Sequence, residues 1–344
     1  MKEQNPNNVD DILNTFERVP FLTWETPLER LPRLSETLGI ELSVKRDDLT
    51  GLAFGGNKVR SLEYYFGKAK AADADTVLIT GAIQSNYVRV VAACAARLGM
   101  ECHIQLEDRV PNVDTIYRKS GNVLLNELLG ATLYFAPTGI DEEGADLQLA
   151  EIATKLTARG RRPFIIPLGP NHLPYGSLGY IRCSGELLRQ TDTFDHLVLG
   201  SGSGQTHAGM LFGLRARGWN GKVIGICVRR AAAAQRSRIS GHCEKIAAML
   251  GIPNPVNDSD IELHDDVLHP GYGVINSFVA NAIKDCARLE GLFIDPVYTG
   301  RVMAGLRACT EKGLIPIFAN TIFLHTGGLP AIFGYETALR NNGL

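Results

Sequence analysis

The feature that most constrains the fold is the alternation of short apolar runs with longer helical patterns along the chain. Six runs have the length and composition of buried strands: residues 76–80, 102–105, 164–166, 197–199, 223–228 and 321–324. Helical spacing of apolar residues covers residues 85–98, 122–129, 178–188 and 206–216. Strands that alternate with helices predict an α/β fold with parallel sheets and crossover helices, and 344 residues are enough for two domains.

Charge and cysteine content exclude several classes of function. The 35 basic and 37 acidic side chains give a net charge of −2, so we expect no binding to nucleic acid or to an anionic membrane. The seven cysteines form no Cys-x-x-Cys pair, the first residues lack the apolar core of a secretion signal, and the apolar stretch at 313–335 is interrupted. We therefore predict a cytoplasmic protein. The His and Asp residues at 264–269 match no metal-site spacing, and we expect no bound metal.

Ligands of open α/β sheets bind beyond the carboxyl ends of strands, and four loops of this chain are unusual. The first, Gly55-Gly56-Asn57-Lys58, leads into a helical pattern. It nearly matches a phosphate-binding P-loop, but Asn57 stands where that motif needs lysine and Val59 where it needs Ser or Thr, so we reject that interpretation. Two glycines permit a tight turn that places Lys58 at a helix start, where the helix dipole disfavours a cation. An amine of lowered pKa suits imine chemistry, and a solvated surface lysine is the alternative.

The second loop, residues 200–206, joins a predicted strand to a predicted helix and reads Gly-Ser-Gly-Ser-Gly-Gln-Thr. Small residues at a helix N-terminus leave backbone N–H groups exposed for an anion. The dinucleotide fingerprint fails, because Gln205 or His207 falls where the third glycine should be and no acidic residue ends the strand at 223–228. A single phosphate therefore fits better than a pyrophosphate, and a merely tight turn is the alternative.

Two further loops place polar side chains at the ends of predicted strands. Gly81-Ala82-Ile83-Gln84-Ser85-Asn86 suits a carboxylate and a phenolic oxygen, although Ser85 could simply cap the helix. His325-Thr326-Gly327-Gly328 offers a threonine that could hydrogen-bond a heterocycle, with a capped turn as the alternative. Tyr272 and Tyr298 lie in glycine-flanked segments, where either phenol could transfer protons or pack in the core or rim.

Together these motifs resemble the D-cysteine desulfhydrase and 1-aminocyclopropane-1-carboxylate (ACC) deaminase family over nearly the whole chain. Members of this family are fold-type II pyridoxal-5′-phosphate (PLP) enzymes, relatives of the tryptophan synthase β-subunit. The resemblance rests on the segments Thr26 to Leu31, Lys45 to Asp48, Gly55 to Lys58, Gln84 to Asn86, Gly202 to Gly209, Asp295 to Gly300 and His325 to Pro330. No single segment is specific, whereas their combination is.

The resemblance implies a role for each matched residue. Lys58 would bind PLP as a Schiff base, and Asn86 would contact the phenolic oxygen of the cofactor. The residues expected to hold the cofactor are Lys58, Asn57, Asn86, Ser203, Gly204, Gln205, Thr206, Thr299 and Thr326. Those expected near the substrate are Gln84, Ser85, Asn86 and Tyr87. Those expected to take part in catalysis are Lys58, Ser85, Tyr272 and Tyr298.

Two positions favour the desulfhydrase branch of the family. ACC deaminases carry Glu after the second tyrosine and Leu after the late histidine, where this chain has Thr299 and Thr326. A carboxylate at the pyridine nitrogen keeps that nitrogen protonated and makes a strong electron sink, which a threonine hydroxyl does not. Elimination of a good leaving group needs less carbanion stabilisation than opening of a cyclopropane.

Other positions depart from the family pattern on the substrate side. Tyr87 replaces the usual histidine, and Ser61 replaces a lysine that helps to neutralise the phosphate in relatives. The segment 171–175 also differs from the usual Gly/Ser-rich loop. Residues 117–125 resemble the L-cysteate sulfo-lyase branch, so a sulfonated amino acid remains an alternative substrate.

The resemblance implies two open parallel-sheet domains with PLP in the cleft between them. We place the small domain at residues 55–168 and build the large PLP-binding domain from residues 1–54 and 169–344. We expect a PLP-dependent lyase that eliminates the β-substituent of an amino acid, with D-cysteine giving pyruvate, ammonia and hydrogen sulfide. L-Cysteate sulfo-lyase, ACC deaminase and a non-catalytic PLP- or phosphate-binding protein are the alternatives. The family also implies a homodimer and a small-molecule amino-acid substrate.

Overall fold

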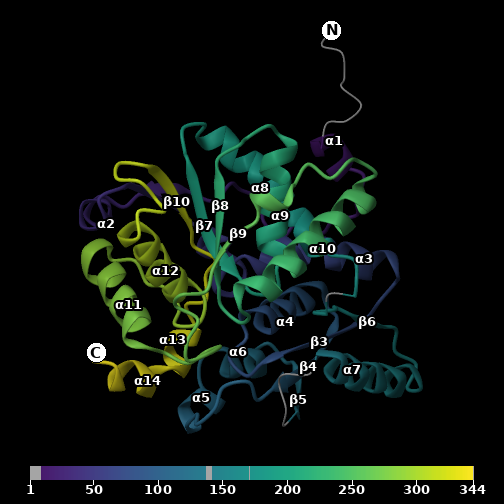
Figure 1. Ribbon diagram of the computed structural model, residues 1–344. Coiled ribbons are helices and arrows are strands. Elements are labelled where there is room, and N and C mark those ends of the chain that lie inside the picture. The colour runs from purple at the N-terminus through teal and green to yellow at the C-terminus, as the bar shows by residue number, and fades with distance from the viewer. Residues whose placement is uncertain (1–8, 137–141, 170, 344) are drawn as a thin grey trace.

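The chain folds around two separate sheets that are almost entirely parallel (Figure 1). The computed structural model describes residues 9–136, 142–169 and 171–343. The segment Met1 to Pro6, on which the absence of a secretion signal is argued, lies outside the described residues. Within the described ranges, no helix is long and apolar enough to cross a membrane, and no cluster of His, Cys, Asp or Glu side chains could hold a metal ion.

The larger sheet is covered by helices on both faces. Its strand order is β1 (Leu28–Arg30), β2 (Glu41–Lys45), β10 (Asn320–Leu324), β7 (His196–Ser201), β8 (Lys222–Cys227) and β9 (Glu262–His264). All neighbours pair in parallel except β1, which is antiparallel to β2. On one side lie α8 (Tyr175–Gln190), α9 (Gln205–Ala216) and α10 (Ala232–Leu250), and on the other α2 (Pro32–Leu38), α11 (Ser277–Glu290) and α12 (Thr299–Glu311) (Figure 1).

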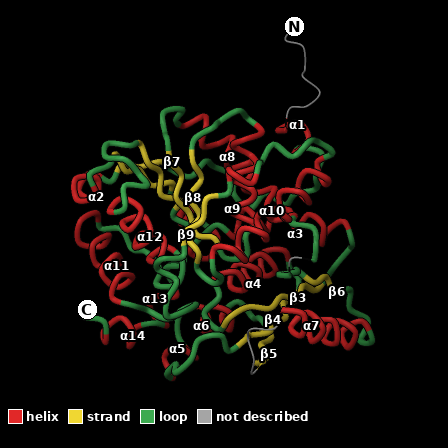
Figure 2. The backbone as a smooth tube through the Cα atoms, viewed as in Figure 1, coloured by secondary structure: helices red, strands yellow, loops and turns green. Residues whose placement is uncertain are grey.

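The smaller sheet forms a second group of strands, separate from the first in Figure 2. Its order is β5 (Thr132–Ala136), β4 (Glu101–Glu107), β3 (Thr76–Ala82) and β6 (Pro163–Ile165), all parallel. Its helices are α3 (Lys58–Ala71), α4 (Asn86–Leu98), α6 (Asn122–Leu128) and α7 (Glu142–Thr157). All residues of β3 are buried, as expected of a central parallel strand covered on both faces.

The remaining elements are short. The helices are α1 (Val9–Leu13), α5 (Thr115–Lys119), α13 (Ala331–Gly334) and α14 (Glu336–Asn341), and single 3₁₀ turns cover Asp47–Leu49, Leu52–Phe54 and Asp258–Asp260. The α/β class and all the strands and helices expected from the sequence are confirmed, with their ends moved by a few residues. The domain boundaries at 55 and 168 stay a prediction, because α3 packs against both α8 and α4.

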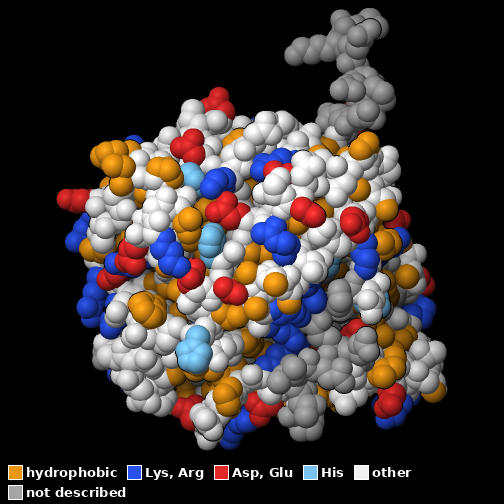
Figure 3. All heavy atoms as spheres, in the orientation of Figure 1, with side chains coloured by type: hydrophobic (Ala, Val, Ile, Leu, Met, Phe, Trp, Pro, Cys, Tyr) orange, Lys and Arg blue, Asp and Glu red, His pale blue; other side chains and the backbone are white. Residues whose placement is uncertain are grey.

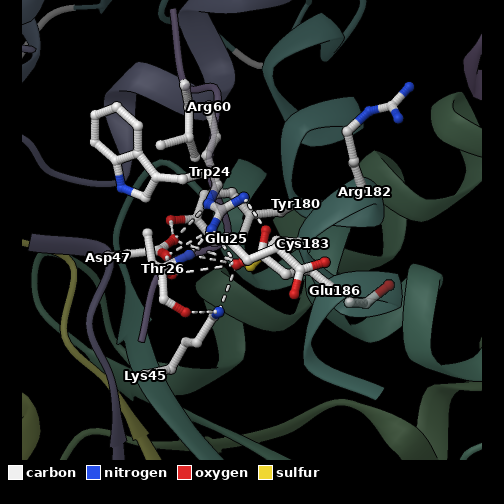
Figure 4. A network of polar contacts seen from close by, with 12 residues as sticks. Trp24, Glu25, Thr26, Lys45, Asp47, Arg60, Tyr180, Arg182, Cys183 and Glu186 are labelled. Atoms are coloured by element: carbon white, nitrogen blue, oxygen red, sulfur yellow. Dashed lines mark hydrogen bonds and ion pairs between the residues drawn. The ribbon is translucent and has the colours of Figure 1, made fainter. Parts of the chain in front are cut away.

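A buried cluster of charged side chains joins α3 to α8 and to the segment that precedes α3 (Figure 4). Arg60 donates to both carboxylate oxygens of Asp47 at 2.9 Å and to those of Glu186 at 2.8 and 2.9 Å. Lys45 pairs with Glu186, and Tyr180 donates to Asp47 at 2.6 Å. Burial alone would raise the pKa of Asp47, but Arg60 and Lys45 hold it below its usual value. Two cations thus balance two carboxylates, and each charge offsets the desolvation of the others.

We predict that Glu186→Gln destabilises the protein strongly. The substitution leaves Arg60 and Lys45 buried with a single carboxylate between them, which costs about 3–5 kcal/mol in unfolding free energy. The matched control is Glu336→Gln, which removes an exposed pair with Arg340 and costs less than about 0.5 kcal/mol. Urea unfolding of the two variants measures the difference, and equal losses would show that the buried cluster is not a stabilising unit.

Candidate active site

A cleft between the two sheets brings together most of the residues expected from the sequence. Two adjoining cavities share the lining residues Lys58, Tyr87, Gly202, Ser203 and Tyr298. One cavity is also lined by Ser85, Arg109 and Tyr272, and the other by Asn57, Asn86, Thr206 and Thr326. Four expected residues line neither cavity: Gln84, Gly204, Gln205 and Thr299.

The cleft lies at the carboxyl ends of strands from both sheets, as the general rule for open α/β sheets predicts. Ala82 ends β3, Gly202 follows β7, and Val228 follows β8. Figure 3 shows Lys and Arg side chains gathered along the boundary between the two sheet-bearing parts on the face in view. Arginines at positions 109, 229 and 238 line the cleft, so its field attracts anionic ligands.

Lys58 begins α3, and the backbone before it favours glycine. Gly55 has φ +63°, and a Cβ there would lie 2.1 Å from the carbonyl oxygen of Asp48, while Gly56 has φ +114°. The Lys58 amine lies 4.8 Å from the centre of the Tyr87 ring. Burial lowers the pKa of Lys58 from 10.5 to about 8, because little water remains to solvate the ammonium group. A usable fraction of the amine is therefore neutral near pH 7, as a nucleophile requires.

Asn57, in the loop before α3, forms hydrogen bonds to the loop after β10 and to the loop after β7. Its backbone N–H donates to the carbonyl oxygen of Thr326 at 3.0 Å. Its side-chain amide donates to the hydroxyl of Thr206 at 3.0 Å. Lys58 is therefore held in a fixed relation to the loop after β7 and to the loop after β10.

The loop between β7 and α9 leaves backbone N–H groups unpaired. Gly204 has φ +94°, and a Cβ there would lie 2.8 Å from His242. The Ser203 carbonyl accepts from Arg238 Nε at 2.8 Å and lies 3.0 Å from Nε2 of His242. Burial lowers the pKa of His242 to about 4, so this imidazole stays neutral. Among the described residues nothing accepts from the N–H groups of Ser203 and Gly204, so these donors and the first N–H groups of α9 are free to bond an anion.

The start of α4 is built by three consecutive polar residues. Ser85 caps the helix with its hydroxyl. Asn86 lines the cleft, and its side-chain oxygen Oδ1 accepts from the side-chain amide of Asn122 at 2.9 Å. The Gln84 amide accepts from the N–H of Asn122 at 3.0 Å and donates to the carbonyl of Tyr117 at 2.6 Å. Gln84 is thus buried and braces the neighbouring segment, although it was expected near the substrate.

Two residues expected at the cofactor direct their side chains to other partners. The Gln205 amide bonds the Tyr65 hydroxyl at 3.2 Å. The Thr299 hydroxyl donates to the carboxylate of Asp295 at 2.7 Å and accepts from its N–H at 2.6 Å. Both side chains are buried. Of the two threonines that distinguish the branches of the family, only Thr326 lines the cavities described above.

Tyr272 and Tyr298 form a hydrogen-bonded pair of phenols, with their hydroxyl oxygens 2.8 Å apart. Burial raises the pKa of Tyr298 well above 10, the neighbouring Tyr272 adds to the shift, and Arg109 opposes it. Arg109 is held by two bonds to Glu107, at 2.8 and 3.0 Å. Sequence reasoning missed Arg109, although its place just after the predicted strand at 102–105 could have marked it.

Comparison with known proteins places the chain in a family. Residues 19–327 match the family model described as "Pyridoxal-phosphate dependent enzyme". The chain is 39% identical to a 1-aminocyclopropane-1-carboxylate deaminase of Mesorhizobium japonicum, over 96% of this chain and 100% of the relative. It is 41% identical to a D-cysteine desulfhydrase of Yersinia enterocolitica, over 94% of this chain and 97% of the relative. The crystal structure of an ACC deaminase homologue has a TM-score of 0.88 at 34% identity, covering 98% of this chain and 100% of that one.

The fold and the cleft define a fold-type II enzyme, and the chain belongs to the pyridoxal-phosphate dependent enzymes. Its relatives include D-cysteine desulfhydrases and ACC deaminases, so it is a PLP-dependent lyase or deaminase of that family. The described residues fit the cofactor: a lysine of pKa about 8 lines both cavities, and unpaired N–H groups lie at the loop after β7.

We predict that the Lys58 amine of the cofactor-free protein titrates near pH 8. Desolvation favours the neutral amine, so reductive methylation of Lys58 should reach half its maximal rate near that pH rather than near 10.5. Mass spectrometry of digests prepared across a pH series measures the modification. Lys222, whose side chain is 54% exposed, is the reference in the same digests. A Lys58 midpoint at the ordinary lysine value would refute the desolvation of this amine.

Proposed function

We propose that this chain catalyses α,β-elimination of a β-substituted amino acid, with D-cysteine as substrate and pyruvate, ammonia and hydrogen sulfide as products. The observation that carries the proposal is Thr326, which lines the cleft where an ACC deaminase is expected to carry leucine. Thr299 stands where an ACC deaminase is expected to carry glutamate. Neither side chain supplies a carboxylate that would keep a pyridine nitrogen protonated, and a weaker electron sink favours elimination over ring opening.

Lys58 and the loops around it would bind and orient the reactants. PLP, when bound, supplies the electron sink for the bond broken at the substrate α-carbon. Lys58 would hold the cofactor, and its amine would take the substrate α-proton, a role that a pKa near 8 suits at neutral pH. The N–H groups of Ser203 and Gly204 would hold the phosphate. Ser85 and Asn86, at the N-terminus of α4, would orient the substrate carboxylate and the phenolic oxygen of the cofactor.

The phenol pair suits stabilisation of the leaving group. Tyr298 keeps its proton at neutral pH, because burial raises its pKa well above 10. A departing hydrosulfide is a weaker base than a phenolate, so Tyr298 can donate a hydrogen bond to the leaving anion while it keeps its proton. Tyr272, whose hydroxyl oxygen lies 2.8 Å from that of Tyr298, orients this phenol.

L-Cysteate is the second candidate substrate, because one cavity contains Arg109, Arg229 and Arg238 together with Tyr272. The positive charge of these guanidinium groups attracts a sulfonate, as it does a carboxylate or phosphate. Sulfite would then be the leaving group, in place of hydrogen sulfide.

We also propose a homodimer, a cytoplasmic location and the domain division at residues 55 and 168. The seven cysteines are all buried and free, which suits a reducing compartment. Several large apolar side chains are more than half exposed, among them Phe54 and Phe293, and such surface favours an interface. The two separate sheets support the division of the chain.

A product screen tests the proposed reaction. We expect the holoenzyme to release pyruvate from D-cysteine and little 2-oxobutanoate from ACC, with L-cysteine, β-chloroalanine and L-cysteate in the same assay. Lys58→Ala should lower the rate by about 10²–10⁴-fold, because the proton-transfer group is lost. Lys222→Ala, at an exposed position outside the cleft, should leave it unchanged.

The outcomes of this screen separate the candidates. Robust 2-oxobutanoate release from ACC would overturn the proposed elimination. Pyruvate from L-cysteate but not from D-cysteine would select the sulfonate substrate. A PLP spectrum with no product from any substrate would indicate a non-catalytic PLP-binding protein.

A further inference from the structure

Arg301 is one of the largest fully buried side chains of the protein, and it bonds to backbone carbonyls. Its Nη1 donates to the carbonyls of Val267 and Leu268, and its Nη2 to those of Gly271 at 3.2 Å and Val274 at 2.8 Å. A single guanidinium group thus donates hydrogen bonds to four backbone carbonyls of one loop. Because a buried cation is costly unless it is well solvated by dipoles, such an arrangement holds the loop tightly around the side chain.

The loop in question lies between β9 and α11 and carries Tyr272. It has few backbone hydrogen bonds of its own, among them the N–H of Leu268 to Asp265 and that of Val274 to Gly271. Gly271 on one side of Tyr272 has φ +146°. A glycine-rich segment without regular pairing has many accessible conformations, so its geometry depends on contacts from outside.

Arg301 also belongs to the helix that positions the partner phenol. Tyr298 is the N-cap residue of α12, and its N–H donates to the carboxylate of Asp295 at 3.0 Å. Arg301 follows Tyr298 by three residues, on the first turn of the same helix. Helix α12 therefore contacts both phenols' segments. It carries Tyr298 at its N-terminus, and its Arg301 side chain bonds the loop that carries Tyr272.

We propose that Arg301 is a positioning residue that sets the contact between the hydroxyls of Tyr272 and Tyr298. The side chain lines neither cavity of the cleft, so its effect on the reaction passes through Tyr272. The catalytic part of this inference rests on the proposed function, because it takes the phenol pair to serve elimination. The structural part of the inference is that the hydrogen bonds of Arg301 hold the loop at 267–274, and this part does not depend on the reaction.

The first test measures the loop in the cofactor-free protein. Arg301→Lys keeps a positive charge, but one ammonium group cannot bond four carbonyls spread over this loop. We expect amide hydrogen exchange at 267–274 to quicken by about tenfold or more, because local opening becomes easier, with no such change in β3. The matched control is Arg307→Lys, on the same helix, where the side chain pairs with Asp285 at the surface. Unchanged exchange at 267–274 in Arg301→Lys would overturn the proposal.

The second test is a double-mutant cycle in the holoenzyme. Arg301→Lys should lower kcat by about tenfold or more, with KM and PLP affinity within about twofold, because misplacing one group costs rate more than binding. In a Tyr272→Phe background, Arg301→Lys should have little further effect on kcat, since both changes act through one phenol. Fully additive losses would refute positioning through Tyr272.

The two tests distinguish failure of this inference from failure of the proposed function. If no substrate releases pyruvate, the elimination is refuted, while the exchange measurement still decides whether Arg301 holds the loop. If elimination occurs and exchange is unchanged, the proposed function stands and the role of Arg301 is refuted. Arg301→Met, which removes the charge, would quicken exchange further if it folds, and Arg301→Lys decides the matter if it does not.

Discussion

Two residues after Lys58, the guanidinium group of Arg60 bonds both carboxylates of a cluster that is closed to water, Asp47 and Glu186. Separating these charges would leave some of them desolvated without a partner, which is among the costliest changes that a protein interior can undergo. The first turn of α3 is therefore fixed against α8 and against the segment that follows β2. Because Lys58 begins this helix, its backbone is fixed as well, and its side chain lines the cleft from a position that cannot easily shift.

The neighbouring loops complete the cleft around that fixed amine. Asn57 bonds both Thr326 and Thr206, so the loops after β10 and β7 meet at the residue before Lys58. Arg89, also fully buried, bonds the carbonyls of Ala53 and Gly55 in the turn that leads to Lys58. Backbone held from several directions keeps a strained turn in place, and the desolvation that lowers the pKa of Lys58 follows from this close packing.

The sequence alone predicted the fold class and the loops of the cleft, because both depend on local patterns. Apolar alternation marks buried parallel strands, and the carboxyl ends of such strands mark the site, which is why Lys58, Ser85, Asn86 and Ser203 fall in one cleft. Strands β1, β2, β5 and β9 were missed, and β1, β2 and β9 contain charged side chains that interrupt any apolar run.

Side-chain direction, in contrast, depends on tertiary partners that lie far away in the chain. Gln84 was expected near the substrate, but its side-chain amide forms hydrogen bonds with the segment at 117–122. Thr299 was expected at the cofactor, but its hydroxyl donates to the carboxylate of Asp295. No local pattern distinguishes a polar side chain that faces a cavity from one that braces a loop. For the same reason the roles of Arg109 and Arg301 emerged only when their partners, Glu107 and the carbonyls of the loop at 267–274, were placed around them.

The central claim is that Lys58 is the residue to which PLP is bound, and borohydride reduction of the holoenzyme tests it most directly. Reduction converts the bond between cofactor and lysine into a stable secondary amine, which survives digestion and can be located by peptide mass spectrometry. The account predicts one phosphopyridoxyl group, on the peptide that contains Lys58, and no labelled peptide in Lys58→Ala. A label on another lysine of the unmodified protein would contradict it.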